Sequence, residues 1–98
     1  MQIHTTSQDR QVVIQIKGVF NFKGHQQFRQ AYEGHAANSR FVLDFAGIEA
    51  IDSSALGMLL ILREYAGGDE SNITITNVPA EIGKILDVAR FNELFKMG

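Results

Sequence analysis

Hydrophobic and polar residues alternate over residues 11–17, and the hydrophobic positions share one face: Val12, Ile14 and Ile16. This period of two is typical of a half-buried β-strand. A short β-branched run at residues 3–6 precedes it, and polar residues 7–10 separate the two segments. The pattern predicts two strands joined by a hairpin turn, with Gly18 closing the second strand and residues 19–22 forming an aromatic link.

Three later segments have the spacing of helices. Over residues 24–37, one stripe recurs at three or four positions: Phe28, Ala31, Tyr32 and His35. A second helix is expected after residues 52–54 (Asp-Ser-Ser), whose side-chain oxygens are typical N-caps, and it continues to about Ala66. A third begins at Pro79, which suits a first helical turn. Its stripe consists of Ile82, Ile85, Leu86 and Ala89.

Two further strands are predicted between the helices. Residues 41–45 are almost continuously apolar, as in a strand buried on both faces of a sheet, although Asp44 interrupts the run. Residues 72–77 alternate, and the apolar tail at residues 91–95 is either a last strand or a turn. The order β-β-α-β-α-β-α, with or without that last strand, predicts an α/β fold in which helices cover a mixed sheet of four to five strands.

Composition narrows the class of protein. The chain has 98 residues, so residues 1–98 are expected to form a single domain. Its net charge of −2 offers no basic surface to nucleic acid or to an anionic membrane. The longest uncharged apolar stretch, residues 55–62, is shorter than the ~20 residues of a membrane span, and residues 1–10 contain no apolar signal. The absence of cysteine fits a reducing compartment, so we expect a soluble cytoplasmic protein.

The sequence lacks the common patterns of catalytic and metal sites. The glycine pair at residues 67–68 has no lysine of a phosphate loop, and Ser53 lacks the glycine flanks of a hydrolase nucleophile. The histidines are too far apart for the spacing of helical metal ligands: His4, His25 and His35. We therefore expect no enzyme, no catalytic residue, no cofactor and no metal.

The Asp52-Ser53-Ser54 segment supports two interpretations. The first is an ordinary helix N-cap by Asp52 or Ser53, worth about 1 kcal/mol. The second is a phosphorylation site, because a serine at the start of a helix is accessible and the helical amides tolerate a phosphate. Asp52 would repel that phosphate, so modification would change the surface potential without unfolding the chain.

The helix behind these serines is unusually apolar. Seven of the eight residues after Ser54 are hydrophobic, and Gly57 is the eighth. A helix that only covered a sheet would have a polar outer face. Leu56, Leu59 and Leu60, with the stem of Arg63, would cover the sheet and leave other apolar residues unused: Met58, Ile61 and Leu62. Complete burial within the domain is one explanation, and a surface for a partner protein is the other.

Residues 41–62, FVLDFAGIEAIDSSALGMLLIL, resemble the central signature of the STAS domain, the family of anti-anti-sigma factors and related sulfate-transporter tails. In that family a strand ending in Asp-aromatic or Asp-Leu leads to Asp-Ser-Ser or Asp-Ser-Thr and an apolar helix. The match here consists of Leu43-Asp44-Phe45 and then residues 51–57. The likeness extends to residues 18–22, which take the place of the family's Gly-x-Leu-Asp loop, and to the strand and helix around Pro79.

The resemblance implies an anti-sigma factor antagonist in a bacterial partner-switching pathway. The family's partner is an anti-sigma factor or switch-protein serine kinase of the histidine-kinase-like ATPase class, which supplies the ATP and Mg²⁺. That kinase would phosphorylate Ser53, with Ser54 as second choice, and a PP2C-type phosphatase would reverse the reaction. Supporting residues at the phosphorylation site would be Asp52, Asn21 and Asp44. The expected partner-binding residues are Ser54, Ala55, Met58, Leu59 and Leu62.

Two departures from the family pattern bear on this hypothesis. Asn21 stands where the family usually has aspartate. The asparagine keeps a hydrogen-bonding side chain but lacks the charge. This difference bears on how readily Ser53 is phosphorylated. The sequence also stops at Gly98, before the final helix of longer members. The alternative function is a constitutive STAS subunit bound to an ABC transporter ATPase, without a phosphoswitch. Homodimerisation, the identity of the partner and the regulated output stay open.

Overall fold

The chain folds as a five-stranded sheet with helices on one side. The computed structural model describes all residues 1–98. The strands are β1 (Gln2–Gln8), β2 (Gln11–Phe20), β3 (Arg40–Ile51), β4 (Ile73–Thr76) and β5 (Lys96–Met97). The α-helices are α1 (His25–Glu33), α2 (Ser53–Tyr65) and α3 (Ala80–Val88). Three short 3₁₀ turns complete the chain: η1 (Phe22–Gly24), η2 (Gly68–Glu70) and η3 (Phe91–Glu93).

The strands follow one another across the sheet in chain order, β1-β2-β3-β4-β5. The β1–β2 pair is antiparallel and the other three pairs are parallel. The hairpin turn between β1 and β2 consists of Asp9 and Arg10, both with positive φ, as a two-residue type I′ turn requires. The predicted mixed α/β sheet is confirmed, and the apolar tail forms both a turn, η3, and a last strand, β5.

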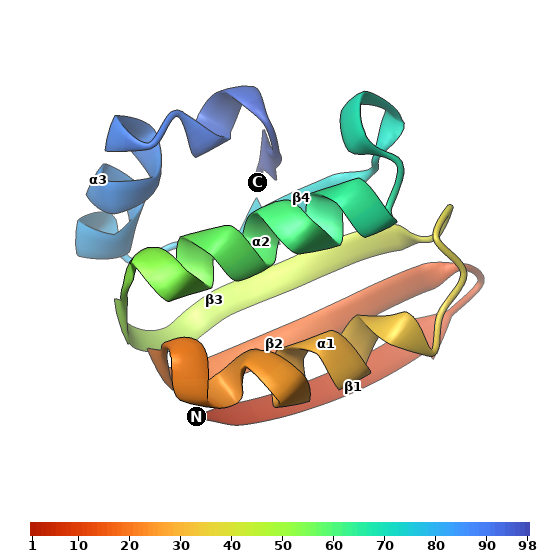
Figure 1. Cartoon of the computed structure of the whole chain (residues 1–98), viewed down its shortest axis with the longest axis horizontal. Helices are drawn as coiled ribbons and strands as arrows, with labels where there is room; N and C mark the ends of the chain where they lie inside the picture. The colour runs from red at the N-terminus through yellow and green to blue at the C-terminus, as the bar shows by residue number, and fades with distance from the viewer.

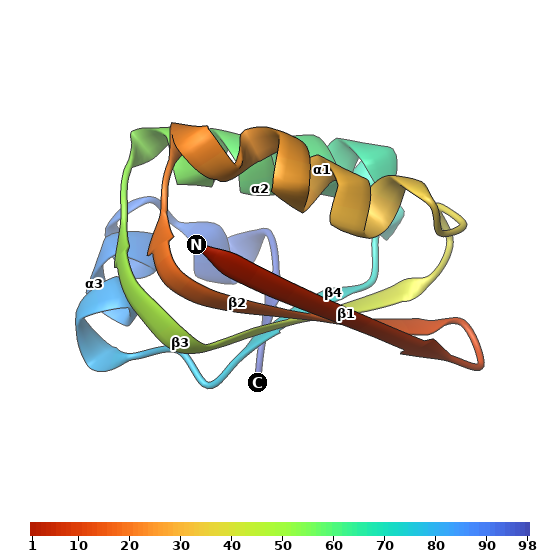
Figure 2. The same cartoon turned by 90° about the horizontal axis from the view of Figure 1, so that it is seen from below.

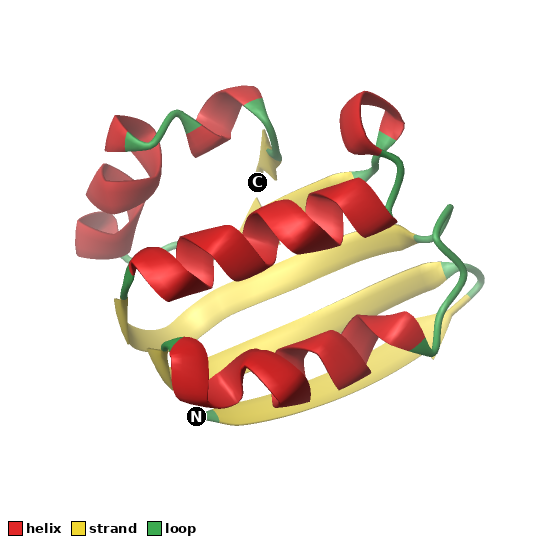
Figure 3. Cartoon of the chain, viewed as in Figure 1, coloured by secondary structure: helices red, strands yellow, loops and turns green.

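Helices α1 and α2 lie side by side over one face of the sheet, and the opposite face carries no helix (Figures 1 and 2). Figure 3 shows the same division, with α1 and α2 in front of the strands. Parallel strands added in one direction by right-handed crossovers place every connecting helix on the same side. The core of 21 buried residues therefore forms a single layer between this sheet face and the helices.

Strand β3 is buried on one face only, which corrects the expectation of burial on both. Phe41, Leu43 and Phe45 are at most 1% exposed, whereas Val42 and Asp44 are half-buried. Asp44 interrupts the apolar run because it lies on the open face of the sheet. Val42, an apolar residue on the same open face, makes the hydrophobic run continuous. The run therefore resembles that of a strand buried on both faces.

Strands β2 and β3 extend further than the sequence pattern indicated. Residues 46–51, expected to form a loop, continue β3, and β2 continues through Gly18 to Phe20. The pairing of β2 with β3 shifts between Gln15 and Lys17 and again between Gly18 and Val19. Such bulges place an extra residue in one strand and break the period of two. The alternation therefore ends at a bulge, although the strand itself continues.

Helix α1 is shorter than the predicted span of residues 24–37. It ends at Glu33, so His35 lies beyond it, while Phe28 and Tyr32 provide its buried side. The Tyr65 hydroxyl donates to the carbonyl oxygens of Glu33 at 3.2 Å and His35 at 2.5 Å. These bonds join the C-terminal end of α1 to the C-terminal end of α2.

Candidate functional site

The start of α2 is built by a cap that the sequence suggested. Asp52 has an extended backbone, and its Oδ1 accepts a hydrogen bond of 3.0 Å from the amide of Ala55. The Asp52 carbonyl also accepts from the amides of Ala55 and Leu56. Of the two proposed capping residues, Asp52 is the one that caps.

Ser53 is the first residue of α2 and is exposed, whereas Ser54 is half-buried. The first amides of a helix have no partner within it, and they carry the positive end of the helix dipole. The exposed Ser53 therefore lies at the positive end of the α2 dipole and directly follows the Asp52 carboxylate.

Asn21, a proposed supporting residue, lies next to this segment. Phe20 pairs with Ile51 in the parallel register of β2 and β3, so Asn21 and Asp52 leave adjacent strands at the same edge. Neighbouring strands are about 4.8 Å apart. The side chain of Asn21 accepts a hydrogen bond of 3.1 Å from the amide of Lys23 and thereby caps η1. Two capping residues thus stand side by side at the carboxyl ends of two parallel strands.

Asp44 does not belong to this site, which corrects its assignment as a supporting residue. It precedes Ile51 by seven residues along β3, a path of roughly 20 Å in an extended strand, and it lies on the open face. Its Oδ1 accepts from the amide of Ala46 at 3.0 Å and from the side chain of Asn77 at 3.1 Å. These hydrogen bonds, led by that from Ala46, lower the pKa of Asp44. Asp44 therefore stabilises the first bulge of β3 and joins it to the end of β4.

The apolar residues of α2 are oriented differently from the expectation. Ala55, Leu59 and Leu62 have no exposed surface, and Met58 is 8% exposed. Ala55, Leu59 and Leu62 pack in the core and are not accessible to a partner, so their assignment as partner-binding residues is wrong. Met58 is almost fully buried and Ser54 is half-buried. The side of α2 that faces the core was predicted wrongly, because a helix that is apolar almost all round has no clear polar face by which to orient it.

The outward side of α2 is a strip that we call the outer stripe. Its members recur at helical spacing from the first residue to the last turn: Ser53, Gly57, Leu60, Ile61 and Glu64. Leu60 and Ile61 are 40% and 60% exposed. A Cβ atom built on Gly57 would meet nothing within 4 Å. The packing of the domain therefore does not explain the glycine, which leaves the helix backbone accessible between the serine and the two exposed aliphatic residues.

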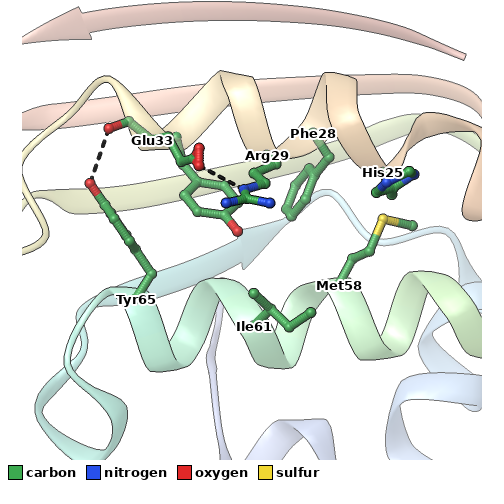
Figure 4. Close-up of a pocket in the computed structure, with 8 residues that line it drawn as sticks. His25, Phe28, Arg29, Glu33, Met58, Ile61 and Tyr65 are labelled. Carbon is green, nitrogen blue, oxygen red and sulfur yellow. Dashed lines mark hydrogen bonds and ion pairs between the residues drawn. The ribbon is translucent and has the colours of Figure 1, made fainter.

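Sequence reasoning missed a groove between α1 and α2 (Figure 4). It has a volume of about 640 Å³. Its lining residues come from both helices: His25, Phe28, Arg29, Tyr32, Glu33, Met58, Ile61 and Tyr65. Phe28 and Tyr32 had been identified as a helical stripe, but no local signal connects them to Tyr65. The groove exists only because the two helices pack against each other.

No helix of the structure has the length and apolar character needed to cross a membrane. The side chains of histidine, aspartate and glutamate form no group of three or more that could hold a metal ion.

Comparison with protein families gives a match over almost the whole chain. A family profile described as "Mlab, STAS domain" matches residues 3–96. A STAS-domain containing protein of Pseudomonas aeruginosa is 46% identical over 89 residues, which cover 90% of this chain and 88% of that protein.

Solved structures show the same fold at low sequence identity. An anti-sigma factor antagonist from Mycobacterium paratuberculosis has a TM-score of 0.82 at 17% identity, covering 98% of this chain and 83% of the other. The unphosphorylated form of the anti-sigma factor antagonist SpoIIAA has a TM-score of 0.81 at 15% identity, covering 99% and 88%. Its phosphorylated form, from Bacillus, has a TM-score of 0.74 at 14% identity, covering 99% and 91%.

Proposed function

Because the chain belongs to the STAS domain family, we propose that it is an anti-sigma factor antagonist-like regulator whose binding to a partner protein is switched by phosphorylation of Ser53. The observation that carries this proposal is the position of Ser53, exposed at the start of α2 and in line with Gly57, Leu60 and Ile61. The serine and the apolar residues of the outer stripe can therefore meet the same partner.

Electrostatics explains how one phosphate would act as a switch. Phosphorylation adds about −1.5 to −2 charges at neutral pH, roughly as much as the net charge of −2 that the chain already carries. The helix amides offset part of this charge within the domain, so the fold persists. A partner that covers Ser53 would have to desolvate the phosphate next to the Asp52 carboxylate, and this cost weakens docking.

The outer stripe provides the apolar part of the docking surface. Leu60 and Ile61 offer side chains, and Gly57 lets a partner approach the helix backbone closely. Helix α3 lies at the end of the molecule where α2 begins (Figures 1 and 2), and two of its apolar residues are exposed, Ile85 at 40% and Val88 at 87%.

The proposed partner is a serine kinase of the histidine-kinase-like ATPase class, which supplies ATP and Mg²⁺, and a PP2C-type phosphatase removes the phosphate. The chain itself acts by binding and needs no catalytic group. Support for these partners comes from the Asp52-Ser53-Ser54 motif at an accessible helix start and from the fold shared with anti-sigma factor antagonists. A cytoplasmic location follows from this proposal, because such kinases act on proteins of the cytoplasm.

The decisive experiment is incubation with the cognate kinase and ATP, followed by mapping of the phosphate by mass spectrometry. We expect phosphate on Ser53 and none on the Ser53→Ala variant. In calorimetry, Ser53→Asp should weaken kinase binding at least about tenfold, while Ser53→Ala should bind like the original chain. An unmodified Ser53, or equal affinities for the two variants, would contradict the switch.

A second candidate is a constitutive STAS subunit bound to the ATPase of an ABC transporter. Asn21 favours it, because this neighbour of Asp52 has no charge and its side-chain oxygen is engaged as the cap of η1. Such a subunit would use the same outer stripe without phosphorylation. Stable co-purification with a transporter ATPase that Ser53→Asp leaves unchanged would establish this function in place of the switch.

A further inference from the structure

The groove between α1 and α2 has the dimensions of a small-molecule site. Its volume of about 640 Å³ lies within the ~300–1,000 Å³ typical of such sites. Figure 4 shows His25 and Met58 at one end, Glu33 and Tyr65 at the other, and Phe28 and Ile61 between them. Polar side chains therefore occur at both ends of the groove, and apolar side chains lie between them.

The apolar part of the groove is rigid at its base. Phe28 is 1% exposed and Met58 is 8% exposed, so both are fixed by the core, whereas Ile61 is 60% exposed at the rim. The rings of Phe28 and Tyr32 pack with centroids 5.5 Å apart and nearly perpendicular planes. Aromatic edges and a thioether sulfur favour contact with another aromatic ring.

The polar part contains a hydroxyl that the fold does not use. Tyr32 is only 3% exposed as a residue and lines the groove, but its hydroxyl is open to solvent there, since no buried polar side-chain atom of the chain lacks a hydrogen-bond partner. A hydroxyl that opens into a groove can donate to an acceptor bound there. The neighbouring hydroxyl of Tyr65 is different, because it already donates to the carbonyls of Glu33 and His35. Burial raises the pKa of Tyr32, so its hydroxyl stays protonated and able to donate at neutral pH.

Arg29 and Glu33 lie near Tyr32 in the lining of the groove, and Arg29 can attract a polar or anionic acceptor group of a ligand. Arg29 donates from Nε to Oε1 of Glu33 at 2.6 Å, and this ion pair lies on the exposed side of α1. A guanidinium has five N–H donors in total, so the terminal nitrogens of Arg29 remain available. The charge of Arg29 lowers the pKa of Tyr32 and the charge of Glu33 raises it, both less strongly than burial does.

We propose that the groove between α1 and α2 binds a small aromatic molecule that carries a hydrogen-bond acceptor, such as an aromatic carboxylate or carboxamide. The ring packs against Phe28 and Met58, and the acceptor receives the hydrogen bond of Tyr32. Such binding needs neither phosphorylation nor a partner protein. It is therefore tested on the isolated chain, and its outcome is independent of the proposed switch.

The test is a titration of the isotope-labelled chain with 2-naphthoate and, separately, 2-naphthamide, followed by NMR of the backbone amides. We expect saturable shifts confined to α1 and α2 around the groove, with at least one probe. Tyr32→Phe keeps the ring and removes only the unused hydroxyl, so its unfolding midpoint should not change. Its affinity for the probe should fall about five- to tenfold.

Two aliphatic residues provide a matched comparison. Ile61→Ala, at the rim, should weaken probe binding, whereas Val88→Ala, on α3 outside the groove, should leave it unchanged. Three results would overturn the proposal: no saturable shift with either probe at millimolar concentrations, equal affinity for Tyr32→Phe, or shifts that map elsewhere. Occupation of the groove only by an aromatic side chain of a partner protein would likewise exclude the small-molecule site.

Discussion

Asp52 combines a structural task with an electrostatic one. Its side chain holds the amide of Ala55, and its charge lies next to the exposed Ser53. Asparagine can accept the same hydrogen bond without the charge. Substitution at this position therefore separates the stability of α2 from the effect of charge at the phosphorylation site.

We predict that Asp52→Ala lowers the free energy of unfolding by about 1 kcal/mol, while Asp52→Asn lowers it by only a few tenths. Urea unfolding monitored by circular dichroism measures both. If the asparagine variant were as unstable as the alanine variant, the charge at the helix start would matter more than the cap.

Asp44 makes stability depend on pH. The pKa of its carboxyl is lowered in the folded chain, first by the amide of Ala46 and then by Asn77. A group with a depressed folded pKa contributes stability above its unfolded pKa of about 3.9 and loses it as the pH falls through the folded pKa. The contribution is therefore present at neutral pH and disappears in acid.

The corresponding variant is Asp44→Asn. At pH 7 we expect it to be less stable than the original chain, because it loses the charge-assisted hydrogen bonds at the first bulge of β3. Below about pH 4 the difference should shrink as Asp44 is protonated. Chemical unfolding at a series of pH values tests this, and a constant difference down to pH 2 would contradict it.

At the scale of elements, the glycines of β3 and α2 differ in whether the structure has room for a side chain. A Cβ on Gly47 would come within 2.6 Å of Cγ and 3.3 Å of the backbone Cα of Lys17, where β2 and β3 approach closely after the first bulge. A Cβ on Gly57 would meet nothing. Glycine is therefore required by the sheet but not by the packing of the helix.

Gly57→Ala should raise the free energy of unfolding by up to about 1 kcal/mol, since alanine is the better helix former and no clash opposes it. Gly47→Ala should be destabilising. Thermal unfolding of the two variants provides the comparison. If the outer stripe docks a partner as proposed, Gly57→Ala should also bind that partner less tightly despite its greater stability.

At the scale of the whole molecule, the one-sided sheet decides which residues stabilise it. Neighbouring residues of β2 point to opposite faces: Ile14 is fully buried under the helices, and Val13 is half-buried on the open face. The same alternation across all strands leaves a largely polar face, in which Gln15 donates to Asp44 over 3.4 Å.

We predict that Ile14→Ala costs about 2–5 kcal/mol, the usual range for truncation of a buried aliphatic side chain, and that Val13→Ala costs less than about 1 kcal/mol. Guanidinium unfolding distinguishes the two. Similar losses would mean that another layer covers the open face in solution.

Much of the fold could be predicted because its signals are local. Alternation in residues 11–17, the capping residue Asp52 and the stripe with Phe28 and Tyr32 each depend on a few neighbouring positions. Predictions were wrong where the pattern depended on distant residues. The loop expected after Phe45 is a bulged strand, because pairing with β2 continues despite the lost alternation.

The candidate site shows the same division. Ser53 is exposed at the start of α2 and Asn21 lies beside Asp52, whereas Asp44 lies elsewhere and most of the apolar residues of α2 face the core. The local sequence could not orient α2, because almost every position of its first two turns is apolar.

The sequence by itself determined the order of the first seven elements, a helix cap at Asp52 or Ser53, the serine at the start of α2 and membership in the STAS family, since these depend on residue type and spacing. The tertiary structure alone decided which side of α2 faces outward, how the bulges extend β3 and where a groove forms between α1 and α2. These features arise from packing between segments far apart in the chain. A local pattern specifies how an element forms, but its neighbours decide which of its faces is buried.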